Sequence, residues 1–151
     1  MISSVSSLRS LRQALLASTQ DLSLEQVNRI PQGFRNNIAW NMGHMIASMQ
    51  GLCYQRSGVA PRIQESMLAP YRPGTVPEHP VDEHEWKRIG EDLIRTADWL
   101  EQDLESGLFT SYDPLPTRSG ITLSSAREAA DFLLFHQGFH QGYIAALRHC
   151  L

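Results

Sequence analysis

The stretch AREAADFLLFHQGFHQGYIAAL, residues 126–147, carries an apolar stripe at steps of three and four residues, the periodicity of one face of an α-helix. Two histidines, His136 and His140, interrupt the middle of this stripe. They lie about one turn apart, so both imidazoles lean to the same side of the helix. Helices use this spacing to offer two nitrogens to one metal ion, although a buried, hydrogen-bonded histidine pair without a metal is an alternative. Because two ligands hold an ion weakly, a metal site needs a third ligand from another helix.

A candidate for this third ligand is His44, the only histidine of a second helical segment. It lies beside a seam of methionines that is typical of a helix packed on other helices. The neighbouring residues Gly43, Ala47 and Gly51 are small, which would let another helix approach closely. Taken alone, His44 is best interpreted as a hydrogen-bonded histidine at a helix contact. Together with the pair on the last helix, it predicts a three-histidine metal site.

Helical periodicity predicts four long helices, and no segment alternates convincingly as a β-strand. The helices span about 4–20, 36–55, 82–104 and 124–148, with a short helical piece at 24–27. The spacing of a capping box is found in Asp82 with Glu85 and in Ser125 with Glu128. The proline-rich residues 57–81 form a long connection, either functional or a crossover, and residues 108–122 form a connector with room for a short hairpin. These elements predict an all-α fold, a four-helix bundle with a long connection between helices 2 and 3.

Length and composition predict one globular domain, residues 1–151. Of the 151 residues, 42% are hydrophobic and 19% charged, which excludes a disordered chain. Thirteen Lys and Arg against sixteen Asp and Glu give a net charge of −3, so no basic excess favours binding to nucleic acid. No apolar run reaches the ~20 residues of a membrane helix, and no membrane partner is expected. The two cysteines, Cys53 and Cys150, cannot form a disulfide framework, which fits a reducing compartment such as the cytoplasm.

Two motifs resemble the DinB-like (DinB/YfiT) superfamily of bacterial metal-binding four-helix-bundle proteins. They are NIAWNMGH at 37–44, which matches a Trp-x-x-x-His element, and HQGFHQG at 136–142, which matches a His-x-x-x-His-x-Gly element. The resemblance covers essentially the whole chain. It implies that His44, His136 and His140 bind a divalent metal ion, often zinc or nickel, and that Gly142 allows close packing beside the metal. It also implies a homodimer, and the characterised members include transferases and an isomerase that use bacillithiol, mycothiol or glutathione.

Two functions are compatible with these observations. The first is a metal-dependent enzyme that transfers a low-molecular-weight thiol to an electrophilic small-molecule substrate, with Tyr71 and Arg72 of the long connection bordering the substrate. The second is a non-catalytic metalloprotein, a stress-response or interaction module in which the ion cross-links the second and fourth helices. A plain helical bundle whose core histidines are satisfied without a metal is a third, weaker interpretation.

The other reactive side chains are expected to be structural or solvated. His79 and His84 lie in a proline- and acid-rich stretch, His149 and Cys150 lie at the end of the chain, and Cys53 is expected in the core. Glu128 and Asp131 are expected to face solvent rather than to act as a general acid or base. The sequence therefore indicates no catalytic residue apart from the metal site itself.

Overall fold

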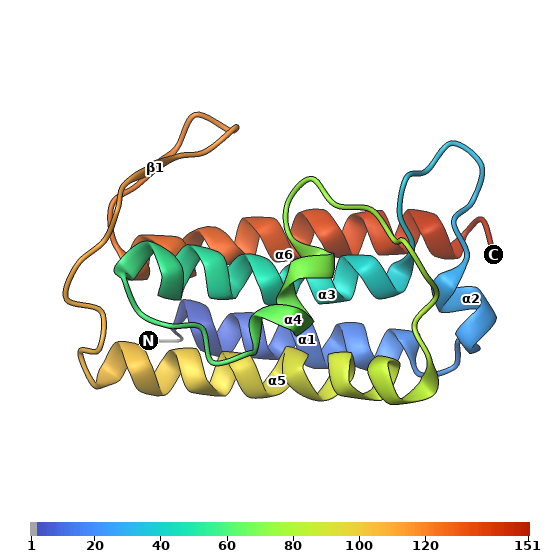
Figure 1. Ribbon diagram of the computed structural model, residues 1–151, viewed down its shortest axis with the longest axis horizontal. Helices are drawn as coiled ribbons and strands as arrows, with labels where there is room; N and C mark the ends of the chain where they lie inside the picture. Colours follow the sequence, from blue (N-terminus) through green and yellow to red (C-terminus); the bar gives the residue numbers. More distant parts are fainter. Residues whose placement is uncertain (1–2) are drawn as a thin grey trace.

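The computed structural model describes residues 3–151 and is mostly helical, as the sequence predicts (Figure 1). Its α-helices are α1 (Ser4–Thr19), α2 (Leu24–Asn28), α3 (Ile38–Met49), α4 (Glu65–Leu68), α5 (Glu83–Glu105) and α6 (Ala126–Arg148). A π-helical turn η1 (Gln50–Tyr54) and a 3₁₀ turn η2 (Gln55–Ser57) continue α3, and a second 3₁₀ turn η3 (Ala69–Tyr71) follows α4. Two short strands, β1 (Leu115–Pro116) and β2 (Thr122–Leu123), pair antiparallel as a hairpin in the connector before α6.

The four long helices lie side by side along the longest axis of the molecule (Figure 1). Helices α1 and α6 run in one direction, and α3 and α5 run in the other. Both α1 and α3 pack against α5 and α6. Because α3 and α5 are parallel, the chain between them must return along the length of the molecule, which explains the long proline-rich connection. No helix among residues 3–151 has the length and apolar character needed to cross a membrane.

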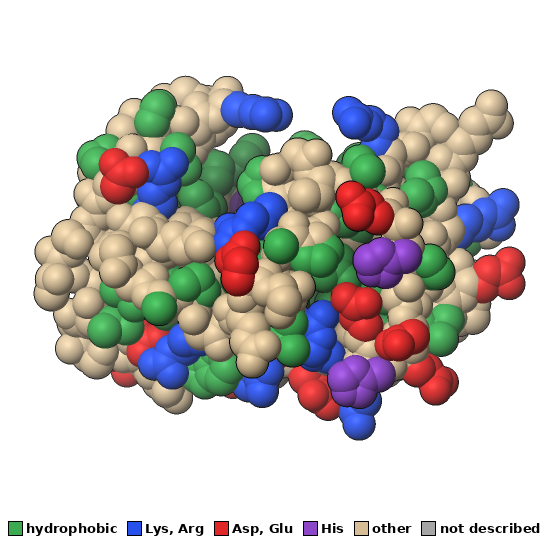
Figure 2. Space-filling view, viewed as in Figure 1, with side chains coloured by type: hydrophobic (Ala, Val, Ile, Leu, Met, Phe, Trp, Pro, Cys, Tyr) green, Lys and Arg blue, Asp and Glu red, His purple; other side chains and the backbone are tan. Residues whose placement is uncertain are grey.

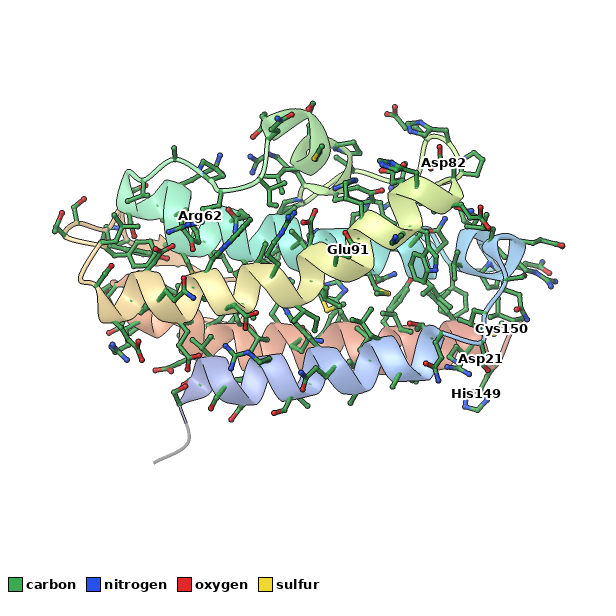
Figure 3. The ribbon with its side chains drawn as sticks, turned by 90° about the horizontal axis from the view of Figure 1, so that it is seen from below. Asp21, Arg62, Asp82, Glu91, His149 and Cys150 are labelled. Carbon is green, nitrogen blue, oxygen red and sulfur yellow. The ribbon has the colours of Figure 1, made fainter. Side chains whose placement is uncertain are left out.

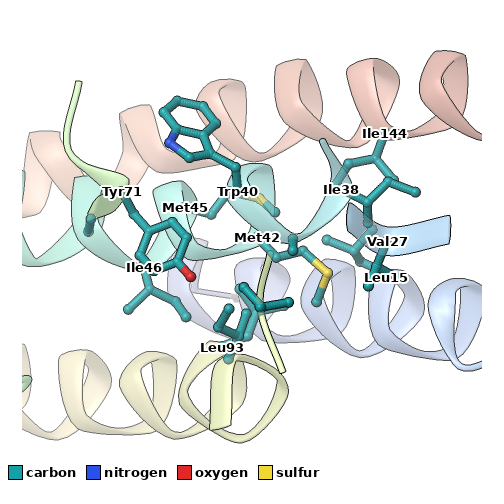
Figure 4. Packing of buried hydrophobic residues seen from close by; sticks show 14 of the residues in the cluster. Leu15, Val27, Ile38, Trp40, Met42, Met45, Ile46, Tyr71, Leu93 and Ile144 are labelled. Carbon is teal, nitrogen blue, oxygen red and sulfur yellow. The ribbon is translucent and has the colours of Figure 1, made fainter. Parts of the chain in front are cut away.

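The core combines side chains from all four long helices (Figure 4). The methionine seam of α3 is buried, and its Met42 belongs to the same cluster as Leu15 of α1, Leu93 of α5 and Ile144 of α6. Each buried side chain of this size stabilises the fold by about 1.5–3 kcal/mol relative to an exposed one. The packing of these apolar side chains fixes the rotation of α3 about its axis. It therefore fixes which of its polar residues, including His44, face the other helices.

Arg12 of α1 is buried in this core with 1% of its surface exposed. Its guanidinium donates to the Leu93 carbonyl at 2.8 Å and to the Thr96 hydroxyl at 3.1 Å, both on α5. Longer bonds of 3.4 Å reach Gln137 Oε1 on α6 and the Met45 carbonyl on α3. Burial lowers the pKa of Arg12 to about 10, which leaves it charged at neutral pH. One cation thus connects all four long helices through neutral acceptors.

Polar contacts hold the first part of the long connection against α5 (Figure 3). The guanidinium of Arg62 pairs with the buried carboxylate of Asp103. The hydroxyl of Tyr54 donates to the same carboxylate at 2.6 Å. The amide of Arg62 also donates to Gln50 Oε1 at 2.7 Å. The connection is therefore fastened near its start.

Candidate metal centre

The structure brings the three predicted histidines together between α3 and α6. His44 comes from α3, and His136 and His140 come from consecutive turns of α6. The ring centroid of His44 lies 5.3 Å from that of His136 and 4.9 Å from that of His140, and the latter two centroids are 4.5 Å apart. One nitrogen from each ring can be chosen so that all three lie within 4.8 Å of one another. The cluster can therefore hold a metal ion.

The ring of His44 is fixed from two sides. Its Nδ1 lies 2.7 Å from the carbonyl oxygen of Tyr71, and because a carbonyl only accepts, Nδ1 carries the proton. Nε2 is therefore the unprotonated nitrogen, and the Ser48 hydroxyl, 3.2 Å away, donates to it. A bound metal ion would take this lone pair in place of the hydroxyl. The indole of Trp40 stacks on the ring with centroids 4.6 Å apart and planes 9° apart. The Trp40 indole nitrogen in turn donates to the Thr75 hydroxyl at 3.0 Å.

Asn41 orients the ring of His140. Its Oδ1 accepts a hydrogen bond from Nδ1 of His140 at 2.8 Å. The amide nitrogen of Asn41 donates to the Asn37 carbonyl at 2.7 Å and to Asn36 Oδ1 at 2.9 Å, so the side-chain oxygen is turned toward the histidine. Nε2 of His140 is left with a free lone pair. Sequence reasoning assigned no role to Asn41, although it precedes His44 by three residues within the motif at 37–44.

Burial keeps the three imidazoles neutral. Desolvation lowers the pKa of His44. It lowers the pKa of His136 to about 3, with further contributions from His140, His44 and Arg12. It lowers the pKa of His140 to about 4, and His44 contributes to that shift as well. Neutral imidazole is the form that binds metals, so the rings are ready ligands at neutral pH.

The residues present fit a divalent transition metal ion. Four-coordinate zinc binds imidazole nitrogen at about 2.0–2.1 Å, which places neighbouring nitrogens about 3.3 Å apart. The three nitrogens, which lie within 4.8 Å of one another, would have to come closer together around such an ion. Imidazole ligands suit zinc, nickel, copper and iron. Within the described part of the chain, 3–151, no second cluster of three histidine, cysteine or carboxylate side chains of this kind occurs.

A pocket of about 910 Å³ gives access to the three rings. It lies between α3 and α6 and is bordered by the β1–β2 hairpin and the residues after η3. Figure 2 shows the corresponding hollow beside the hairpin, with hydrophobic side chains inside it and basic side chains at its rim. A pocket of this volume has the size of a small-molecule site.

The two connection residues expected to border the substrate behave differently. Arg72 lines the pocket. The side chain of Tyr71 does not line it and is buried, with its hydroxyl donating to Glu85 at 2.7 Å. A Cβ atom on Gly43 would lie 2.4 Å from the Tyr71 ring, so the small residue admits this ring rather than a neighbouring helix. Tyr71 thus acts on the site through its backbone carbonyl.

The expectation for Gly142 is wrong. A Cβ atom at this position would meet no atom within 4 Å, and the residue is exposed. Gly142 faces away from the core because the inward face of α6 at this level is formed by its neighbours, among them the buried His140 and Ile144.

The remaining reactive residues lie outside the candidate site, as expected. The exposed residues are His79, His84, His149 and Cys150, the last two at one end of the molecule near Asp21 (Figure 3). Burial raises the pKa of Cys53 to about 12, which makes its thiol a poor nucleophile. Glu128 accepts from the amide of Ser124, and Asp131 accepts from the hydroxyl of Ser4.

Comparison with known proteins agrees with this geometry. No curated protein matched the sequence. The family model of the DinB superfamily matches residues 7–144, a range that contains all three histidines and Asn41. The match covers far more than half of the chain. The chain therefore belongs to the DinB superfamily.

Proposed function

We propose that the protein is a single-domain four-helix bundle, residues 1–151, with its long connection between the second and third long helices. We propose further that it binds one divalent metal ion, zinc or nickel, through His44, His136 and His140. The observation that carries the proposal is the protonation of these rings and the orientation of their nitrogen atoms. Burial lowers the pKa of all three, which favours the neutral form, and hydrogen bonds at Nδ1 of His44 and His140 leave Nε2 as the nitrogen that can bind a metal ion. Three converging lone pairs stabilise a bound cation, and the Nδ1 bonds are the contacts that orient metal-binding histidines.

The open pocket favours a catalytic role for the site. Three neutral ligands leave a divalent ion its positive charge and open coordination positions, and such an ion, when bound, lowers the pKa of water or a thiol and polarises a carbonyl group. Of the carboxylates in residues 3–151, only Asp113 lines the pocket, and it is ion-paired with Arg56. The chain therefore supplies positioning rather than a free general base. A low-molecular-weight thiol added to an electrophile suits this pocket, because a thiol loses its proton far more readily than water.

The same absence of a free acid or base supports a second candidate, a non-catalytic metalloprotein in which the ion joins α3 to α6. Such a protein would act as a stress-response or interaction module. The homodimer and the cytoplasmic location stay predictions under either candidate.

Metal analysis tests the site. We expect the purified protein to hold about one equivalent of zinc or nickel per chain and His140→Ala to lose it while keeping its helical circular dichroism. His79→Ala is the matched control, because His79 is an exposed histidine of the long connection. A protein that is metal-free and cannot be loaded would refute the site, and unchanged metal content in His140→Ala would remove His140 from the ligands.

Turnover distinguishes the two candidates. The loaded protein would be incubated with bacillithiol, mycothiol or glutathione and a set of electrophiles, and loss of free thiol would be followed. Thiol consumption that His44→Ala abolishes and His79→Ala preserves would support the transferase. A fully loaded protein that reacts with none of these pairs would favour the non-catalytic metalloprotein.

A further inference from the structure

The pocket beside the three histidines carries a charge opposite to that of the whole chain. The protein has a net charge of −3. The pocket, however, is lined by Arg56, Arg72 and Arg118, with Asp113 as the only acidic residue among the described ones. The histidines that line it have lowered pKa values and so add no charge of their own at neutral pH. The lining is therefore cationic, and a bound divalent ion would make it more so.

One of these three arginines has no partner. Arg56 is ion-paired with Asp113. Arg72 is ion-paired with Glu65, and its Nη1 donates to Gln55 Oε1 at 2.9 Å. The guanidinium of Arg118, in contrast, forms no ion pair and no hydrogen bond with any residue of the range 3–151. It offers five N–H donors to a ligand in a planar arrangement that matches a carboxylate or a phosphate.

The hairpin that carries Arg118 is fastened to the body of the molecule at its base. The amide of Asp113 donates to the Arg56 carbonyl at 2.6 Å, and the Ser111 hydroxyl donates to the Ser57 carbonyl at 3.1 Å. At its tip, the amide of Thr117 donates to the Ile121 carbonyl at 2.8 Å. These contacts hold the backbone of Arg118 at the mouth of the pocket, while its side chain is free to turn toward a ligand.

The part of the pocket wall that α6 forms is aromatic and largely exposed. Phe135 and Phe139 on α6 lie on either side of His136 in sequence and line the pocket, yet they are 59% and 60% exposed. The ring of Phe132 lies 5.6 Å from that of Phe135 and extends this wall. Leaving such rings in water costs about 25 cal/mol for each Å² of apolar surface. A flat apolar group placed against them would recover this free energy.

We propose that the pocket binds a small molecule whose anionic group, a carboxylate or a phosphate, is held by Arg118 and whose apolar, aromatic body lies against Phe135 and Phe139. The inference rests on the proposed function in one respect, namely that the reacting end of this molecule faces the three histidines. The volume of about 910 Å³ accommodates such a molecule together with a second, smaller reactant.

Calorimetric binding of matched probes tests this inference. The probes are phenylbutyrate, phenylbutyl phosphate and the neutral phenylbutyramide, each titrated into the protein as purified and into chelator-treated protein. We expect the better of the two anions to bind at least about tenfold more tightly than the amide, since hydrogen bonds between charged groups are stronger than those to a neutral amide. The affinity ranking of carboxylate and phosphate identifies the natural anionic group.

Chelation separates this inference from the metal site. Anion binding that persists in the metal-free protein supports anchoring by Arg118, even if the proposed metal function fails. Anion binding that disappears on chelation and is unaffected by Arg118→Gln would show that the anion contacts the ion, which would overturn the inference and leave the metal site supported.

Variants locate the two parts of the site. Arg118→Gln should weaken the anions about tenfold or more and the amide less than about twofold, with Arg118→Lys in between. Arg29→Gln is the control, because Arg29 is an exposed arginine outside this pocket whose loss changes the net charge equally. Equal effects of Arg118→Gln and Arg29→Gln would overturn the anion anchor.

Phe139→Ser tests the aromatic wall and should weaken all three probes. If it changed the oligomeric state in size-exclusion chromatography while probe affinity stayed constant, the exposed rings would belong to a self-association surface. That outcome would overturn the role of the aromatic wall in ligand binding.

Discussion

At the scale of single residues, Asn41 holds the ring of His140 through one hydrogen bond, and its own amide nitrogen is held by Asn37 and Asn36. We predict that Asn41→Leu raises the dissociation constant for zinc about 10- to 100-fold, because removing a hydrogen bond that orients a metal ligand has effects of this size. Competition with a chromophoric chelator measures it. Asn36→Ala, which removes one of the two hydrogen bonds that hold the Asn41 amide nitrogen, should have a smaller effect, and wild-type affinity in Asn41→Leu would exclude this role.

The buried histidines also make the stability of the metal-free protein depend on pH. Burial lowers the pKa of His136 to about 3 and that of His140 to about 4, whereas an unfolded histidine titrates near 6.5. Between these values the unfolded chain binds more protons than the folded one, so acidification favours unfolding. We predict that going from pH 7 to pH 5 lowers the free energy of unfolding by about 2 kcal/mol for each of these two rings.

Urea unfolding of chelator-treated protein at the two pH values measures this loss. The double variant His136→Gln, His140→Gln should show a much smaller pH dependence, because neither ring remains to be protonated. A variant with the full dependence of the wild type would assign the effect to other groups.

At the scale of elements, the η3 turn places the backbone carbonyl of Tyr71 within hydrogen-bond distance of His44. It sits on α3 only because Gly43 leaves room for the ring of Tyr71. We predict that Gly43→Ala displaces this turn, destabilises the protein by about 1–3 kcal/mol and weakens metal binding. Thermal unfolding and zinc titration measure the two effects.

Gly142→Ala is the matched control on α6. It meets no neighbouring atom, so it should stabilise the helix by about 0.5–1 kcal/mol and leave zinc affinity unchanged. If Gly43→Ala bound zinc as tightly as Gly142→Ala, the η3 turn would have no part in holding His44.

Helix boundaries were readable from the sequence to within a few residues, whereas the side-chain partners at the caps were not. Asp82 and Ser125 cap α5 and α6 as their spacing predicts, accepting from Glu85 N at 2.8 Å and Glu128 N at 3.1 Å. The reciprocal bonds do not form, because the Glu85 carboxylate accepts from Tyr71 and the Glu128 carboxylate accepts from the amide of Ser124. The predicted helix 36–55 begins two residues later, with Asn37 as its cap, and widens into a π-helical turn after Met49.

At the scale of the whole molecule, a metal ion held by His44 on one side and by His136 and His140 on the other would join α3 to α6. Anything that binds only the folded state stabilises it, and a free ion concentration of 100 times the dissociation constant contributes about 2.7 kcal/mol. We predict that chelation lowers the melting temperature by roughly 5–10 °C for a domain of this length. Differential scanning calorimetry measures the shift. His140→Ala should show almost none, and an equal shift in that variant would mean that the chelator acts elsewhere.

What the sequence alone determined about this protein was local. The spacing of His136 and His140, the apolar faces of the helices and their N-caps depend on residues within about one helical turn, and the two motifs sufficed to bring His44 into the same site. The tertiary structure decided the rest: the Tyr71 carbonyl on His44, Asn41 on His140, the burial of Arg12 among four helices, and the free Arg118 at the mouth of the pocket. Most of these contacts join residues dozens of positions apart, and such a contact exists only once packing has brought its partners together, so no local pattern encodes it.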